Sequence, residues 1–259
     1  MINEHILEEI GMKLEKLADD PRYYDRRKNL VVQSLRSIGD VYSFWIENPG
    51  LRKALLLEKS NEKKIRKMAR KGIQDVNNGW YYLTEIGKSR KFVDYLDANI
   101  LKKLNGLVNP NMDMPRDFRK KDVTLNIRGY TPCSWEKVPN KVDEAIKTIK
   151  ELYTENPIIS AITAHLSLTA IQPFMDGNKR CARLVQDRIL FDMGMPPAII
   201  TAGEGKFYHE LLVKTVPAYH DGDKDGQGQF YDYCASKINN GLDEILGDLF
   251  EEPHIINNH

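Results

Sequence analysis

The sequence is poor in cysteine, nearly neutral in charge and without a long apolar run, and each shortage excludes a class of protein. The three cysteines are dispersed, with neither metal-ligand spacing nor the even number that a disulfide framework needs: Cys133, Cys181 and Cys234. Such usage fits a reducing compartment, so we expect a cytoplasmic protein. The formal net charge of +1 supplies no general attraction to nucleic acid or to a membrane surface.

Signals for membranes and for export are missing as well. No apolar stretch approaches the roughly 20 residues that a membrane span requires. The first residues, Met-Ile-Asn-Glu-His-Ile-Leu-Glu-Glu, are acidic rather than basic ahead of any apolar run, so we expect no signal peptide. The 41% of hydrophobic residues is enough for a core, and 259 residues suit one large domain, alone or with a helical extension.

Apolar residues recur at helical spacing through most of the chain, which predicts a mainly α fold. The exception is 116–131, where Val123, Leu125 and Ile127 alternate with polar residues as in a half-buried strand. We expect helices over residues 4–18, 28–47, 51–71, 92–107, 140–153, 157–171, 181–193, 206–219 and 230–250.

A loop rich in Pro, Asp, Gly and Asn joins two of these apolar helices, at 171–183. Its end opens the second helix, whose first N–H groups lack partners and carry the positive end of the dipole, where phosphate binds. Gly177 lets backbone approach a ligand, Arg180 and Arg183 share a helix face, and Asp176 offers a hard oxygen for Mg²⁺. From these residues alone, a nucleotide phosphate site and an ordinary helix–loop–helix corner remain equally open.

The spacing in this loop resembles the signature of the Fic family, His-Pro-Phe-x-(Asp/Glu)-Gly-Asn-(Gly/Lys)-Arg-x-x-Arg. One position departs from the signature, because Gln172 stands where the family has its His. The resemblance extends in order from Phe92 to Ile238 and implies a Fic-type helical core with a small β-hairpin flap. The matching residues are Pro173, Phe174, Asp176, Gly177, Asn178, Lys179, Arg180 and Arg183.

The resemblance also implies a role for each matching residue. The loop from Gly177 to Arg180, Lys179 included, would cradle the phosphates of ATP, with Asn178 as a side-chain contact. Arg183 would meet the terminal phosphate, Asp176 would hold Mg²⁺, and Phe174 would anchor the loop in the core. Family members usually transfer AMP from ATP to a Ser, Thr or Tyr hydroxyl of a target protein. Lys179 also occurs in the Doc-like branch, which phosphorylates its target.

Gln172 is the residue that decides how far this chemistry carries over. In the family the His is the general base for the target hydroxyl, and Gln has no titratable nitrogen. A positioned base is worth about 10²–10⁴-fold in rate, whereas electrostatic clamping of phosphates survives its loss. We expect nucleotide binding with impaired or absent transfer; the alternative is an inactive protein that binds nucleotide and docks a partner. His165 is two helical turns away, about 10.5 Å, and is expected to pack rather than replace the base.

Two further segments resemble Fic elements. Ser43, Glu47 and Asn48 match the inhibitory helix pattern (Ser/Thr)-x-x-x-Glu-(Gly/Asn), whose Glu would pair with Arg183 and obstruct ATP. The strand near 122–130 resembles the flap, which docks the target's backbone by strand addition. The alternatives are an ordinary helix end and an ordinary hairpin. The residues expected to dock the target are Val123, Thr124, Leu125, Asn126 and Ile127.

The chain is therefore expected to divide into a helical extension with the inhibitory segment near 43–48 (1–90), a Fic-like domain (91–250) and a flexible tail (251–259). A basic run at 63–71 leaves open binding to nucleic acid or to an acidic partner. A solvated helix face is favoured, and the near-neutral net charge argues against nucleic acid as the ligand. Asp residues at 221–232 have the spacing of a calcium loop, but a polar loop between helices is favoured.

Overall fold

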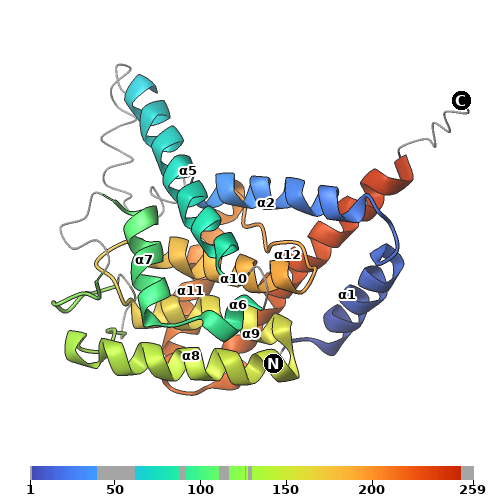
Figure 1. Ribbon diagram of the computed structural model, residues 1–259. Helices are drawn as coiled ribbons and strands as arrows, with labels where there is room; N and C mark the ends of the chain where they lie inside the picture. Colours follow the sequence, from blue (N-terminus) through green and yellow to red (C-terminus); the bar gives the residue numbers. More distant parts are fainter. Residues whose placement is uncertain are drawn as a thin grey trace, which may run out of the picture.

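One deeply buried helix packs against four others in the computed structural model (Figure 1). This helix, α9 (Pro157–Ile171), has 13 of its 15 residues buried, so it is a core element rather than an amphipathic surface helix. Asn156 begins it, because its side-chain oxygen accepts hydrogen bonds from the N–H groups of Ile158 and Ile159. The predicted bounds of this helix are confirmed. Around it pack α8 (Val138–Glu155), α10 (Asn178–Asp192), α11 (Gly205–His220) and α12 (Lys224–Glu251).

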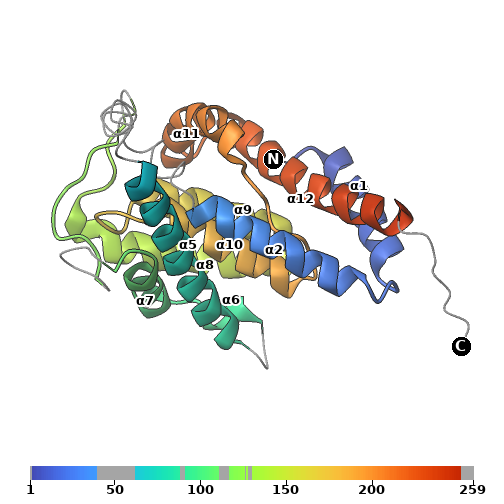
Figure 2. The same ribbon diagram turned by 90° about the horizontal axis from the view of Figure 1, so that it is seen from above.

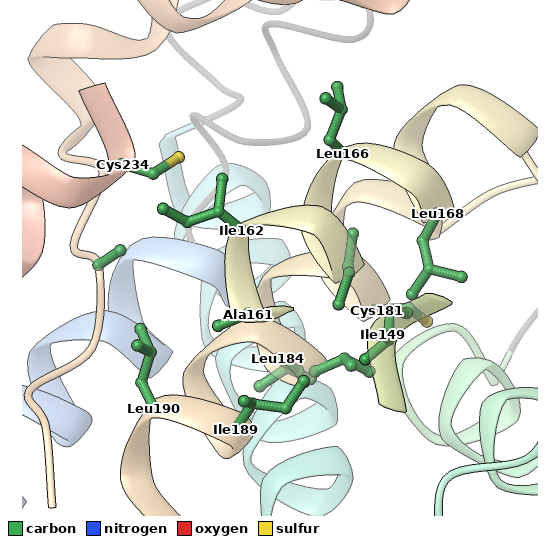
Figure 3. Packing of buried hydrophobic residues seen from close by; sticks show 14 of the residues in the cluster. Ile149, Ala161, Ile162, Leu166, Leu168, Cys181, Leu184, Ile189, Leu190 and Cys234 are labelled. Atoms are coloured by element: carbon green, nitrogen blue, oxygen red, sulfur yellow. The ribbon is translucent and has the colours of Figure 1, made fainter. Parts of the chain in front are cut away.

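The interior between these helices is built from aliphatic side chains and two thiols (Figure 3). Cys181 and Cys234 are both free and buried, and burial raises the pKa of the Cys181 thiol to about 12. They act as small hydrophobic residues here rather than as reactive groups. The labelled core residues of α9 and α10 are Ala161, Ile162, Leu166, Leu168, Cys181, Leu184, Ile189 and Leu190.

The structure describes residues 2–39, 62–87, 91–110, 117–125, 127 and 130–251. Every regular element in these ranges is a helix, so the predicted mainly α class is confirmed. Across the same ranges, no helix combines the length and the apolar character that crossing a bilayer requires. The remaining elements are α1 (Glu4–Leu17), α2 (Tyr23–Gly39), α5 (Glu62–Glu85), α6 (Phe92–Tyr95), α7 (Ala98–Val108) and the 3₁₀ turns Trp135–Lys137 and Ala202–Glu204.

The N-terminal helices pack on the outside of this core (Figures 1 and 2). α1 lies along α12, and α2 packs on α5, α10 and α12. Where α2 and α5 cross, Gly39 meets Gly72 so closely that a Cβ on Gly39 would lie 2.5 Å from the Cα of Ile73. Glycine at this crossing therefore lets the end of α2 rest against α5. The predicted inhibitory residues Ser43, Glu47 and Asn48 lie outside the described residues.

Several helix boundaries differ from prediction: α2 begins at Tyr23 rather than at residue 28, and α5 continues to Glu85 rather than ending at residue 71. At two others a polar side chain caps the backbone. The single helix expected over 92–107 is two helices, since Asp97 accepts a hydrogen bond from the N–H of Ile100 (2.7 Å) and starts α7 afresh. α12 begins six residues early, because Asp223 accepts from the N–H groups of Asp225 and Gly226. The calcium-loop spacing is lost inside this helix, where Asp232 instead accepts from the backbone N–H of Asn3.

The strand predicted at 116–131 is not present in the described residues of that stretch, and the hairpin flap is not confirmed. Backbone groups before and after the predicted strand bond to other partners. The N–H of Arg119 donates to the carbonyl of Pro173 (2.9 Å), and the guanidinium of Arg119 donates to the carbonyls of Lys121 (3.0 Å) and Cys133. A buried arginine thus joins the two ends of the segment in place of strand pairing. Asn126 lies outside the described residues.

Candidate functional site

The loop between α9 and α10 begins with an unusual backbone conformation at Gln172. Its φ of 50° and ψ of 60° are left-handed, and it is the one residue other than glycine with positive φ among those described. L-residues rarely adopt this conformation, which costs of order 1–2 kcal/mol. The N–H of Gln172 donates to the carbonyl of Leu168 and so ends α9. The strain falls at the position where the Fic signature has its His.

The side chain of Gln172 is turned into the protein. Its amide nitrogen donates to the carbonyl of Thr169 (2.6 Å), and its amide oxygen accepts from the side-chain nitrogen of Asn178 (2.9 Å). The residue is 8% exposed. Both ends of the amide are therefore hydrogen-bonded within the protein, and neither can accept a proton from a hydroxyl.

Asn178 closes the loop from its other end. Its side-chain oxygen accepts from the N–H of Phe174 (2.8 Å), and its side-chain nitrogen donates to the carbonyl of Phe174 (2.9 Å) as well as to Gln172. The ring of Phe174 is buried and packs against Phe118, with ring centroids 5.6 Å apart. The side chain of Asn178, for which the resemblance implies a nucleotide contact, therefore links the loop to the start of α10 by hydrogen bonds.

The middle of the loop is held by the C-terminal end of α7. Asn105 donates to the backbone carbonyl of Asp176 (2.8 Å), and Asn109 donates to its carboxylate (3.2 Å). Gly177 follows with a φ of 81°, and a Cβ there would lie 2.9 Å from the side-chain nitrogen of Asn105. Glycine is therefore required at position 177 by both conformation and space. The first hydrogen bond within α10 runs from the N–H of Cys181 to the carbonyl of Gly177, leaving the preceding N–H groups for other acceptors.

The two signature arginines have different surroundings. Arg180 donates to the carbonyl of Val108 (2.7 Å) and lies 3.3 Å from the carboxylate of Asp176, with 18% of its side chain exposed. Arg183 is buried; it donates to the hydroxyl of Ser37 on α2 (3.0 Å) and to the carbonyl of Ile200 (3.3 Å). Burial lowers the pKa of Arg183. The guanidinium of Arg183 is therefore bonded to α2 and to the segment after α10, while that of Arg180 stays at the mouth of the loop.

Two histidines lie near the loop without forming a base for it. Burial, followed by the charge of Lys179, lowers the pKa of His209 on α11. His165 is fully buried, and its ring nitrogens bond to the side-chain oxygen of Gln186 (2.8 Å) and the hydroxyl of Tyr208 (2.7 Å). Burial lowers the pKa of His165 to about 3, so its imidazole is neutral and packed. It does not stand in for the missing signature His.

Asp176 is the residue for which the resemblance implies Mg²⁺. Its carboxylate is one-third exposed, and within the described ranges no three His, Cys, Asp or Glu side chains cluster as a metal cage. Mg²⁺ is usually held by one or two carboxylates together with substrate phosphates rather than by a protein cage. A single carboxylate beside the start of α10 fits a Mg²⁺–nucleotide complex.

Several contacts of this site could not be predicted from the sequence. Asn105 and Asn109 support Asp176, Ser37 binds Arg183, and Arg119 donates to the carbonyl of Gln172 (2.8 Å). None of them belongs to the signature, and all come from segments far from it in the chain. Arg119 lies in an Arg-Lys-Lys run, where composition cannot tell a buried cation from solvated ones.

Fold and loop together define a class: helical proteins in which a glycine-containing loop between two buried helices opens a helix N-terminus lined by arginines. Comparison with known proteins links this class to a family. The model of the Fic/DOC family matches residues 95–190. This matched region contains the signature loop, all of α9 and α10 as far as residue 190, so the chain is similar to the Fic family over the part that forms the site.

Curated relatives match less than half of the chain. Protein adenylyltransferase fic-1 of Caenorhabditis elegans is 28% identical over 121 residues, which cover 46% of this chain and 24% of the relative. Protein adenylyltransferase Fic of Drosophila ananassae is 34% identical over 102 residues, which cover 39% of this chain and 19% of the relative. The chain thus matches about a quarter or less of the length of these relatives.

Solved structures extend the likeness to nearly the whole fold. A Fic domain containing signaling protein from Bacteroides thetaiotaomicron superposes with a TM-score of 0.71 at 16% identity, covering 96% of this chain and 98% of that one. Fic-1 from Caenorhabditis elegans superposes with a TM-score of 0.66 at 19% identity, covering 94% of this chain and 71% of that one. At these identities the superpositions establish a shared fold.

Proposed function

We propose that the protein binds Mg²⁺–ATP at the start of α10 and that its transfer of AMP to a protein hydroxyl is impaired or lost. One observation carries the proposal: the loop retains Gly177 and both arginines, while position 172 holds a buried amide bonded to Thr169 and Asn178. The matched relatives are named protein adenylyltransferases, which supports AMP transfer as the ancestral reaction.

In this proposal the chain contributes binding and charge. The N–H groups that open α10 and the guanidinium of Arg180 would stabilise phosphate oxygens, and the carboxylate of Asp176 would hold the metal. Mg²⁺ supplies charge neutralisation at the phosphates when it is bound. During transfer the target hydroxyl must lose a proton as its oxygen bonds phosphorus and pyrophosphate leaves. Gln172, whose amide is bonded to Thr169 and Asn178, cannot take that proton.

Regulation and target docking follow from the same resemblance. Glu47 would compete with phosphate for Arg183, and the segment at 123–127 would receive the target backbone. The contact between Arg183 and Ser37 supports the first idea, since it brings α2, the helix that leads toward Glu47, onto this guanidinium.

A catalytically silent nucleotide-binding protein is the second candidate. The internal hydrogen bonds of Gln172 favour it, because both ends of the amide are satisfied without substrate. Binding of nucleic acid or an acidic partner through 63–71 has weaker support. Within the described side chains of that run, Lys71 lies 3.8 Å from Asp75, as on a solvated helix face.

The experiment that separates transferase from silent binder measures label from α-labelled ATP in the protein itself and in a cell lysate. A Glu47→Gly background removes the proposed restraint, and Gln172 is compared with Gln172→His. We expect label only with Gln172→His, as for a sound scaffold without its base. Equal label in both proteins would contradict impaired chemistry. A protein that neither labels nor binds Mg²⁺–ATP would contradict the proposed function altogether.

A further inference from the structure

Arg119 connects the catalytic position to the segment that precedes it by 40 to 50 residues in the chain. Its guanidinium has 0% exposed surface, and buried cations need a full set of acceptors. The acceptors are the carbonyls of Gln172, Lys121 and Cys133, and the carboxylate of Asp122 lies 3.5 Å away. Such a convergence of carbonyls on one planar fork is a built arrangement rather than a solvated charge.

Arg119 forms hydrogen bonds to the backbone at the strained residue, Gln172, and at the residue after it. Nε of Arg119 donates to the carbonyl of Gln172 (2.8 Å), and its own N–H donates to the carbonyl of Pro173 (2.9 Å). These two bonds hold consecutive peptide units just after the left-handed residue. The direction of any side chain at position 172 depends on this backbone conformation. Without these two hydrogen bonds the backbone at position 172 would relax, and the direction of its side chain would change.

The same guanidinium holds both ends of 121–133. The carbonyl of Lys121 stands at the start of that segment and the carbonyl of Cys133 at its end. The hydroxyl of Tyr130 adds a bond to the carbonyl of Ala170 (2.9 Å), so the segment is also fastened to the last turn of α9. The same guanidinium therefore bonds to the backbone at position 172 and to both ends of the stretch proposed to receive a target.

We propose that Arg119 is a positioning residue that sets the side chain at position 172 relative to the docked target. The inference rests on the proposed function for its catalytic consequence, though not for its geometric one. Misplacing a reacting group by about 1 Å costs of order 10²-fold in rate. Substitution of Arg119 therefore lowers kcat for transfer and leaves the affinity for Mg²⁺–ATP unchanged, because Asp176 and Arg180 are held by the C-terminal end of α7 and Arg183 by α2.

The chain offers a matched control in Arg188. It too is a buried arginine bound to backbone carbonyls, those of Leu83 and Ile86, but these lie at the end of α5. Arg119→Lys and Arg188→Lys each keep the charge and lose the planar fork. Both are made in Glu47→Gly, Gln172→His protein and compared at equal folded fraction, which thermal unfolding determines.

The first readout is kinetic. We expect Arg119→Lys to lower kcat by about 10–10²-fold with unchanged Kd for Mg²⁺–ATP, and Arg188→Lys to leave both unchanged. Equal losses of kcat in the two variants would reduce Arg119 to a structural residue and overturn the proposal.

The second readout needs no activity and separates this inference from the proposed function. Gln172→His adds one imidazole signal to those of the six native histidines in an NMR spectrum. We expect Arg119→Lys to shift or broaden that signal and Arg188→Lys to leave it in place. An unmoved signal overturns the proposal even if transfer is seen. A moved signal with no transfer in any variant supports the geometry and counts against the proposed function.

A third measurement requires no substitution and guards against loss of folding. The hydrogen bond from Nε of Arg119 to the carbonyl of Gln172 should give a scalar coupling across the bond in a long-range HNCO spectrum. Detection supports the grip on position 172. Absence of the coupling, with the backbone couplings of α9 present, overturns it.

Discussion

Arg180 and Arg183 lie one turn apart on α10. Asp176 lies four residues before Arg180, and Asp187 lies four residues after Arg183. Arg180 faces Asp176, one-third exposed, at 3.3 Å, and both belong to the mouth of the loop. Arg183 precedes Asp187, which is buried and accepts from the hydroxyl of Ser34 (2.6 Å) and the N–H of Ala198. An arginine with a carboxylate four residues away thus occurs twice, once near water as an ion pair and once in the core, where both groups bond to α2.

The difference shows that one helix can carry both a ligand contact and a link to another part of the protein. Near the loop, charges are screened and partners can exchange. Further along α10, Arg183 and Asp187 are bound by two serines of α2, Ser37 and Ser34. Losing a partner destabilises the protein far more for a buried charge than for an exposed one. A change in α2 is therefore expected to affect Arg183 and Asp187 as well.

The largest expected effect is on nucleotide affinity. In Glu47→Gly protein we expect Arg183→Ala to weaken Mg²⁺–ATP binding by about 10²-fold and Arg180→Ala by about 10-fold, since a buried charge-assisted bond contributes more than one near water. Isothermal titration calorimetry measures both. Glu47→Gly alone should tighten binding relative to the parent.

Arg188→Ala provides the control, because this buried arginine of the same helix contacts the end of α5 and not the loop. It should lower stability and leave affinity unchanged. Equal affinity losses for all three arginines would mean that folding, not phosphate contact, explains the effect. No heat with millimolar ATP in Glu47→Gly protein would end the nucleotide hypothesis.

The fold and the loop could be predicted from the sequence much better than the different surroundings of Arg180 and Arg183. α9 is apolar on all sides, so its burial could be predicted from local pattern, and so could the turn at Gly177. Ser37 and Arg183 lie 146 residues apart, and no periodicity shows that they touch. The alternation at 123–127 is real, with Ile127 buried and Thr124 exposed, but it needs a partner strand, and Arg119 takes the carbonyls instead. The alternation of apolar and polar residues indicates which face of a segment is buried, but not which element packs against that face.

The next effect concerns pH and stability. Burial raises the pKa of Asp187 from 3.8 to about 6, although hydrogen bonds and Arg183 oppose the rise. A carboxyl with a raised folded-state pKa contributes stability that is fully present below pH 3.8 and is lost as pH rises through about 6. We expect Asp187→Asn to remove this component, so that the variant gains about 2 kcal/mol on the parent between pH 4 and pH 7.

Urea unfolding at a series of pH values measures this difference. A constant offset between variant and parent across the range would contradict a buried, titrating Asp187. The neutral His165 works in the opposite direction, since its pKa is lowered to about 3 and its contribution is lost as pH falls below 6.5. Comparison of Asp187→Asn with its own parent cancels that background.

The smallest effect tests whether α2 restrains Arg183 directly. The hydroxyl of Ser37 accepts from Arg183 and donates to the carbonyl of Ile200, so Ser37→Ala removes both bonds at a cost of about 1 kcal/mol. Released from α2, Arg183 should bind phosphate more readily, and we expect ATP affinity to rise by about 2–5-fold, within the free energy of one such bond. Ser34→Ala is the matched control: it deletes a hydroxyl of the same helix that binds Asp187 instead. It should lower stability similarly and leave affinity unchanged. If both serine variants bind ATP as the parent does, α2 supports Arg183 without competing for it, and restraint of the site must come from elsewhere in the chain.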